Sequence, residues 1–442
     1  MKRLLIAVLL GVFCLASAGA QALYAGEIDL LLQKLVDKGI LTGAEAQQVK
    51  IETQEQVKKE IAQGQSFSLP AWVQNTKIKG DFRLREEFRR DKAKDDLIRT
   101  RIRARLGIES KVNDKLKVGI GIATGAQGDP RSRNLTLGGK DANTPGDPGT
   151  LVLDYAYAEY QPFIWLKLTA GKFQNPLWRP HDMLWKGDIT PEGLGLNFSH
   201  KVGPKLELFM NDLVFILNGL DSQTSLGAST TSGYPMLYVF QPGFNLSVTD
   251  KINLKSAFSY NYFSQVKGNV QFKKTANTNT IVNGVYAFDY SSINPSAELG
   301  FKEPFGDLPI LKLIPYIGFF GDFIYNVSPG VTTSKSGFDA GIKFGAEKVS
   351  DWGDWQAKVT YSKLGRDAWL DIFTDSDRFQ GRTNTKGVEL QLDYGLGKNT
   401  WLSLDYYAMA YLTKNYQGII GSSQIGGSAP EQLLQIDWNM KF

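Results

Sequence analysis

Two neighbouring stretches of the chain carry basic side chains at every second residue. In the second stretch the basic residues of one phase are Arg99, Arg101, Arg103 and Arg105. In the first stretch they are Lys77, Lys79, Arg83 and Arg85. Guanidinium groups stay charged at any working pH and bind carboxylate or phosphate through two parallel hydrogen bonds. The pattern therefore indicates a surface that attracts small anions.

A spacing of two is the period of a β-strand, whose successive side chains point to opposite faces. The residues between the arginines include Ile98, Ile102 and Leu106, so this strand has one basic and one apolar face. Consecutive strands usually pair, and the two basic rows would then form one wall. Asp81 and Glu87 add two negative charges to this wall. Alternatively, the arginines pair with acids of the opposite wall or of an inward loop. The candidate acids are Glu389, Asp393, Asp405 and Asp437.

The C-terminal residues alternate with the same period. Their apolar positions are Leu434, Ile436, Trp438, Met440 and Phe442. In a soluble protein this apolar face would meet a core. In the bacterial outer membrane it would face lipid, and Trp438 and the terminal Phe442 would close a barrel.

The N-terminus has the features of a secretory signal. Lys2 and Arg3 precede an apolar run from residue 4 to residue 18, and Ala20-Gln21-Ala22 is a suitable cleavage site, so residues 1–22 are predicted to be removed. The run is too short to span a bilayer as a helix. Cys14 is the only cysteine and lies in this segment, so the mature chain has no disulfide and no thiolate metal site.

The composition favours strands that are apolar on one face. Loss of Lys2 and Arg3 lowers the formal charge from +5 to +3, which is too low to suggest a nucleic-acid partner. The chain has 45 glycines and 12% aromatic residues, and no stretch after the signal is apolar for the length of a membrane helix. A membrane protein of this kind must be a closed β-barrel.

Alternating segments predict about sixteen strands. They are 77–90, 97–112, 116–124, 151–161, 164–173, 193–201, 205–217, 235–248, 252–265, 293–303, 311–326, 336–348, 354–364, 387–394, 400–412 and 431–442. Short and long connections alternate, except that the first loop, 91–96, is short where a long one is due. Residues 71–442 are therefore predicted as an all-β transmembrane antiparallel barrel, with both termini on the short-turn, periplasmic side.

Residues 23–70 differ from the rest and are predicted as a periplasmic helical or coiled-coil segment. Thr42-Gly43-Ala44-Glu45 is a capping box, in which the Thr hydroxyl and the Glu carboxylate each satisfy a free amide. This segment is either a solvated linker or a contact with peptidoglycan.

Together these features resemble the family of putative porins of Gram-negative bacteria. The resemblance is carried by EIDLLLQKLVDKGILTGAEA, KIKGDFRLREE, RTRIRARLGIESKVNDKLKVGIGIATG, DYAYAEYQPFIWLKLTAGKFQNP, PEGLGLNFSHKVG and the last strand. It implies a sixteen-stranded, homotrimeric channel in the outer membrane, in contact with lipid and lipopolysaccharide. Such a channel passes small ionic solutes passively and uses no cofactor. The resemblance does not fix the solute, and no ligand residue of the more distant phosphate- and anion-selective porins can be placed on this chain.

The third long connection, 174–192, is the candidate constriction loop. It is rich in Trp and Pro and can hold a rigid shape, and the family resemblance suggests that it folds inward. Trp178 and Trp185 would pack against the inner wall. The residues that would face the solute are Arg179, His181, Asp182, Lys186 and Asp188. The alternative is a loop exposed at the cell surface.

Catalysis has little support, because His181 and His200 are the only histidines available as a general base. Aspartates in the stretch 371–377 could hold calcium, although surface loops are commonly acidic. We therefore expect a diffusion porin that prefers anions. The alternatives are a channel specific for phosphate or a dicarboxylate, and a barrel-anchored tether to the cell wall.

Overall fold

The chain divides into two units, Met1–Gln74 and Asn75–Phe442. The computed structural model describes residues 35–36, 38, 41–49 and 51–52 of the first unit. It describes the second unit except for residues 92–95, 127, 139–145, 147–148, 219–233, 273–275, 277, 307, 309–310, 414–418 and 421–428. No helix among these residues has the length and apolarity needed to cross a membrane.

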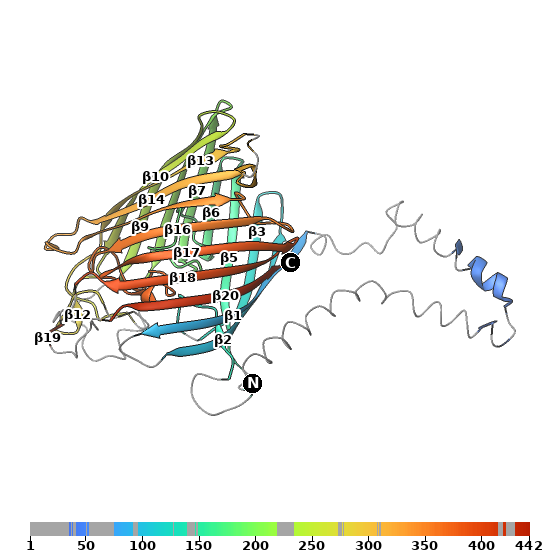
Figure 1. The fold of residues 1–442 in the computed structure, drawn as a ribbon, viewed down its shortest axis with the longest axis horizontal. Coiled ribbons are helices and arrows are strands. Elements are labelled where there is room, and N and C mark those ends of the chain that lie inside the picture. Colours follow the sequence, from blue (N-terminus) through green and yellow to red (C-terminus); the bar gives the residue numbers. More distant parts are fainter. Residues whose placement is uncertain are drawn as a thin grey trace. The chain divides into compact units, whose positions relative to one another are not determined.

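The second unit is a closed antiparallel barrel of sixteen long strands, counted over the described residues (Figure 1). The strands are β1 (Thr76–Asp91), β2 (Leu97–Lys111), β3 (Leu116–Thr124), β5 (Leu151–Phe163), β6 (Leu166–Lys172), β7 (Glu192–Val202), β8 (Leu206–Ile216), β9 (Met236–Ser247), β10 (Ile252–Ser264), β13 (Ser292–Lys302), β14 (Tyr316–Asn326), β15 (Ser336–Gly345), β16 (Trp355–Leu364), β17 (Thr385–Gly397), β18 (Thr400–Tyr411) and β20 (Glu431–Lys441). The predicted fold class and the position of every predicted strand are confirmed. The largest difference is that β14 begins at Tyr316, after a 3-10 turn, η2 (Leu311–Leu313).

The barrel closes where β20 pairs with β1. Asp81 lies opposite Lys441, and Leu84 lies opposite Trp438. The backbone of Phe442 exchanges two hydrogen bonds of 3.0 Å with Gly80. The Phe442 ring lies over Gly80, where a Cβ atom would come within 2.2 Å of it. A side chain at this position would therefore displace the terminal ring from the closing pair of strands.

The outer face of the barrel is apolar because the alternation is in register across strands. Ile78 pairs with Ile108, and Phe88 pairs with Ile98, while Arg83 pairs with Arg103 in the opposite phase. Ile78 and Ile98 are 66% and 65% exposed. A belt of exposed apolar side chains around a polar interior is the arrangement of a barrel that stands in lipid.

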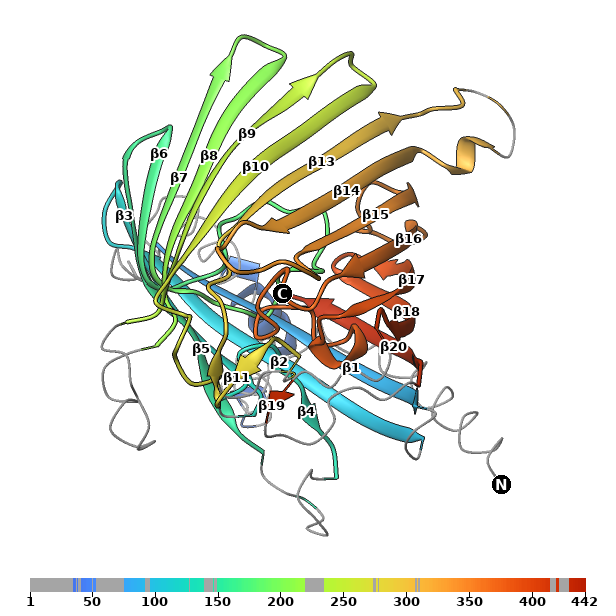
Figure 2. The same cartoon turned by 90° about the vertical axis from the view of Figure 1, so that its left-hand side faces the viewer.

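The long connections gather at one end of the barrel (Figure 2). They include a two-residue strand, β4 (Leu135–Thr136), that pairs with β2. Three more form a separate small sheet: β11 (Ile281–Val282), β12 (Val285–Tyr286) and β19 (Ile419–Ile420). A 3-10 turn, η3 (Phe379–Gly381), lies in the connection before β17.

In the first unit, residues 43–49 are helical. The predicted capping box is formed, because the Thr42 amide donates to Glu45 Oε2 at 2.8 Å and the Glu45 amide donates to Thr42 Oγ1 at 3.3 Å. The rest of the predicted helical segment lies largely outside the described residues.

Candidate functional site

The arginine rows of β1 and β2 line the inside of the barrel and contact carboxylates. Asp81 lies between Arg103 and Arg105, with N–O distances of 2.9 Å and 2.7 Å. Glu87 lies 2.6 Å from Arg99 and 3.5 Å from Arg101. Arginines that face each other in the register would repel without these acids, so Asp81 and Glu87 hold the two rows together.

The C-terminal strand supplies a further acid to this wall. Arg85 donates from Nε and Nη2 to the two oxygens of Asp437, both at 2.7 Å, which is a bidentate pair. Arg83 lies 3.4 Å from Asp437 as well. Arg85 is only 2% exposed. Of the four candidate acids, Asp437 is the one that contacts Arg83 and Arg85, and it lies on β20, the strand beside β1. Pairing with acids of an inward loop, the alternative interpretation of the sequence, describes Arg103 and Arg105, which contact Asp188.

The two lysines of the predicted basic wall, Lys77 and Lys79, lie near the start of β1, away from Arg85. Lys79 lies 2.6 Å from Glu109, and its side chain is 53% exposed. Lys77 is exposed near the start of β1. These lysines are therefore more accessible to solvent than the arginines, of which Arg85 is buried and the others are partly buried.

Loop 173–191 enters the barrel and contacts both sides of its inner wall. On one side, Asp188 lies 3.4 Å from Arg103 and from Arg105 of β2. On the other side, His181 Nδ1 lies 3.0 Å from Asp339 of β15, and its Nε2 lies 3.1 Å from Glu389 of β17. The loop thus spans the interior between strands that are far apart around the barrel.

A second loop, 365–384, also lies inside the barrel. Lys186 of the first loop binds Asp375 and Asp377, the latter at 2.7 Å. Asp377 in turn lies 3.0 Å from Arg85. Trp185 is buried, and its ring lies 4.8 Å from that of Phe373, measured between centroids.

Sequence reasoning missed this second loop. Its aspartates were considered as calcium ligands or as ordinary surface acids. Asp371 instead accepts hydrogen bonds from the amide and the hydroxyl of Thr278, at 2.7 Å and 3.0 Å, and is fully buried. The sequence does contain a signal that this loop is buried. It carries the apolar residues Trp369, Leu370 and Phe373, which are unusual for an exposed loop.

The other residues of the predicted constriction loop have different surroundings. Trp178 packs edge-on to Phe209, and Lys255 lies 5.1 Å above its ring. Burial lowers the pKa of Arg179, against the opposite effect of Asp182. The side chain of Asp182 is 40% exposed. His181 and Asp188 are each 5% exposed, so the prediction that they face the solute is wrong; both are used to anchor the loop.

Burial and paired charges set the protonation of the loop anchors. Burial alone would lower the pKa of His181, but the carboxylates of Glu389 and Asp339 raise it to about 10. Burial would likewise lower the pKa of Lys186, and Asp375 and Asp377 raise it above its ordinary value. These groups are therefore charged at neutral pH.

His181, Asp182 and Glu389 place ligand atoms within 4.8 Å of one another, the only such group among the described residues. A metal would need a free ring nitrogen on His181. Both nitrogens already face carboxylate oxygens, and the raised pKa means that both carry protons. This geometry fits an ion pair better than a metal site.

Comparison with known families identifies the barrel. A family model described as "Putative porin" matches residues 90–292 and 281–442. The chain belongs to this family. No curated protein sequence matches the chain.

Solved structures similar to this chain include three porins and outer-membrane proteins. OprB of Pseudomonas putida superimposes with a TM-score of 0.50 at 11% identity, covering 84% of this chain and 95% of that one. A mutant porin of Rhodopseudomonas blastica gives 0.42 at 10% identity, covering 83% and 100%. OmpT of Vibrio cholerae, described as a trimer form, gives 0.41 at 11% identity, covering 83% and 99%. The porin family and the closed barrel together make this protein an outer-membrane channel.

We predict that the His181 ion pairs stabilise the folded porin at neutral pH and fail in alkali. The folded pKa of about 10 lies above the unfolded value of about 6.5. The contribution is therefore fully present below about pH 6.5 and is lost as the pH rises through about 10. Thermal unfolding of the wild type and of His181→Asn, followed from pH 6 to pH 10.5, should show a difference on the order of 2–4 kcal/mol that shrinks with rising pH. A constant difference would contradict the prediction.

Proposed function

We propose that this porin is a passive diffusion channel for small hydrophilic solutes, narrowed by loops 173–191 and 365–384 together. The observation that supports this proposal is the double anchoring of the first loop. Asp188 contacts Arg103 on β2, and His181 contacts Asp339 on β15. A loop fixed at both sides of the interior can restrict a channel without moving parts.

A mild preference for small anions follows from the composition of the arginine wall. The four arginines of β2 share the carboxylates of Asp81, Glu87 and Asp188. Counted with these three acids alone, the row has one positive charge in excess, and Arg89 of β1 brings a further positive charge to Glu87 at 3.3 Å. Rows of fixed charge are how pores favour ions of the opposite sign, and the extensive pairing keeps the preference weak.

In the orientation that we propose, the long loops face the cell exterior and both termini are periplasmic. The apolar belt then contacts lipid, and the loop side of the barrel contacts lipopolysaccharide. Short turns on the periplasmic rim and longer loops on the outer rim are usual in bacterial barrels.

A homotrimer is the assembly that we propose. A hollow of about 480 Å³ on the outer wall is lined by residues of β5 to β8, among them Leu168, Leu194 and Asp212. Leu194 is 57% exposed, which places this hollow on the outside of the barrel. An outward-facing carboxylate near the middle of a spanning strand is costly in lipid. A second copy of the chain would cover Asp212 and provide polar partners.

The loops should limit conductance. Replacing Trp178–Lys186 by an equal number of Gly and Ser residues removes the anchors His181, Trp185 and Lys186 while keeping the loop length. We expect larger single-channel steps in planar bilayers, because the loop can then leave the interior. Lys186→Gln, which breaks only the link between the two loops, should give a smaller increase. Unchanged steps in both variants would mean that these loops do not form the constriction.

Charge selectivity can be tested by reversal potential in a KCl gradient. The mature protein should give stepwise currents and an anion-directed reversal potential. Asp188→Asn should increase the anion preference, because Arg103 and Arg105 lose their shared carboxylate. Glu303→Gln is the matched control, since Glu303 is 67% exposed at a turn and pairs with Lys251. A cation-directed wild-type potential would refute the anion preference, and an absence of steps from folded protein would refute the channel.

The proposed trimer predicts a mass of three chains by sedimentation equilibrium in density-matched detergent. Ala170→Trp fills the hollow on β6 and should shift the mass towards one chain. Ala104→Trp on β2, away from the hollow, should leave it unchanged. A wild-type mass of one chain would disprove the trimer, and a trimeric Ala170→Trp variant would disprove this interface.

A further inference from the structure

The barrel wall has a notch where loop 173–191 leaves it. The pairing between β5 and β6 ends at Ala156, which lies opposite Lys172. Beyond this point β5 continues to Leu151 and pairs only with β3. The chain turns into the interior after Lys172 and returns to the wall at Glu192. The wall is therefore lower at β6 than at β5, and this step, the notch, lies where the constriction loop begins.

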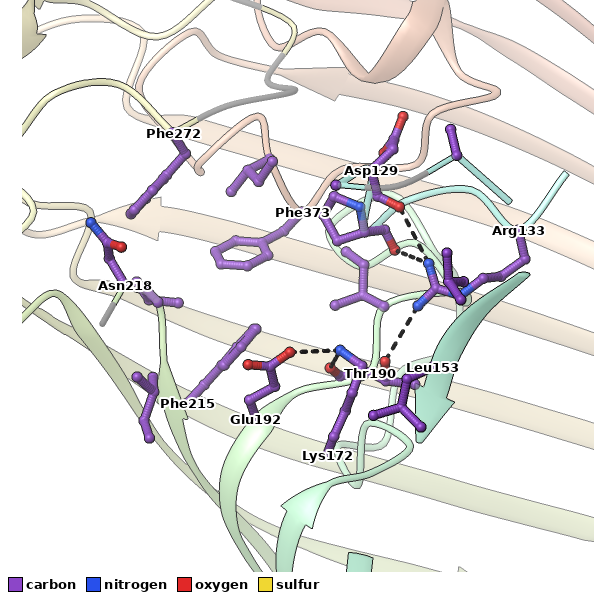
Figure 3. Close-up of a pocket in the computed structure, with 18 of the residues that line it drawn as sticks. Asp129, Arg133, Leu153, Lys172, Thr190, Glu192, Phe215, Asn218, Phe272 and Phe373 are labelled. Carbon is purple, nitrogen blue, oxygen red and sulfur yellow. Dashed lines mark hydrogen bonds and ion pairs between the residues drawn. The ribbon is translucent and has the colours of Figure 1, made fainter. Parts of the chain in front are cut away.

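A pocket of about 530 Å³ lies at this notch (Figure 3). Side chains from six parts of the chain line it. Its apolar lining includes Phe215, Phe272, Phe373, Ile189 and Ile372. Pockets of 300–1,000 Å³ with apolar walls and a few polar groups are typical of small-molecule sites. Aromatic walls favour a ligand with a flat or branched apolar part.

The charged groups of the pocket occur in pairs. Lys172 Nζ lies 2.7 Å from Glu192, and the two side chains are 22% and 59% exposed. Arg133 is held more tightly, because its guanidinium bonds to Asp154 at 2.7 Å. It also bonds to Thr190 at 3.4 Å (Figure 3). The lysine and the glutamate are therefore the pair that a ligand can reach.

The pocket also contains a polar group that the protein does not use. The side-chain nitrogen of Gln271 is buried and has no hydrogen-bond partner among the described residues. A buried donor without a partner costs free energy. This nitrogen is closed to solvent, so Gln271 adds a strained polar group to the pocket wall and leaves the charged recognition to Lys172 and Glu192.

We propose that this pocket binds amphipathic zwitterions, namely apolar amino acids and short peptides. A ligand carboxylate would bind Lys172, its ammonium group would bind Glu192, and its apolar side chain would lie against Phe215 and Phe373. The pairing of charges decides the ligand class. A simple anion that binds Lys172 would leave the Glu192 carboxylate without its partner. A simple cation that binds Glu192 would leave the Lys172 ammonium group without its partner. A zwitterion leaves both paired.

This inference goes beyond passive diffusion, because it gives the porin a binding site for one solute class. The site lies at the loop end of the barrel, beside the constriction loop that carries Thr190 and Ile189. Binding can be measured without any current, so the site and the channel can fail separately.

The test is calorimetric titration of the full mature porin in detergent with three probes. L-phenylalanine carries both charges, 3-phenylpropionate lacks the ammonium group, and phenethylamine lacks the carboxylate. We expect L-phenylalanine to bind about tenfold or more tightly than either analogue. Lys172→Gln and Glu192→Gln should each weaken its binding by about tenfold.

The matched control is Lys167→Gln, on the same strand, whose lysine pairs with Glu159 at 3.6 Å and is not among the pocket residues. It should bind L-phenylalanine like the wild type. Equal binding of 3-phenylpropionate or phenethylamine would overturn the zwitterion assignment. Absence of L-phenylalanine binding, or binding unaffected by both pocket variants, would overturn the site. Normal KCl steps alongside such a result would leave the channel itself intact.

Discussion

Asp377 joins the barrel wall to both inward loops. Its carboxylate contacts Arg85 at 3.0 Å and Lys186 at 2.7 Å, and Arg85 also holds Asp437 of the closing strand. Removing one member of a buried charge pair leaves an uncompensated charge, which costs about 3–5 kcal/mol. The position of each loop is therefore fixed by the other and by the wall, and the shape of the interior depends on this network.

The apolar cluster inside the barrel supports the same arrangement. Trp185 of loop 173–191 lies against Trp369 and Phe373 of loop 365–384. Trp369 is fully buried. Ion pairs give the loops their positions, and the packed rings exclude water from part of the network, which strengthens it. The result is a fixed arrangement of the two loops inside the barrel.

The folding of loop 173–191 into the interior has a consequence for the wall. Because the chain leaves the sheet after Lys172, β6 has seven residues while its neighbour β5 has thirteen. The resulting notch exposes the Lys172–Glu192 pair beside an aromatic surface. The proposed constriction and the proposed zwitterion site thus arise from the same departure of the chain from the sheet.

The sequence by itself determined the barrel. A period of two with one apolar face is a local property, and it located all sixteen strands, because a membrane barrel requires this alternation along every strand. It also placed Arg99 to Arg105 on the inner face. Local pattern could not specify which acids neutralise these arginines, since Asp437 lies more than three hundred residues from Arg85 in the sequence.

Only the tertiary structure decided which side chains contact one another inside the barrel. The closure of β20 on β1 brought Asp437 to the arginine wall, and the long-range contacts of Lys186 brought in loop 365–384. The sequence suggested that His181 faces the solute, yet the fold places Asp339 and Glu389 on either side of its ring. Such contacts join residues that are distant in the chain, so their energies are set by the closed barrel and leave no periodic signal in the sequence.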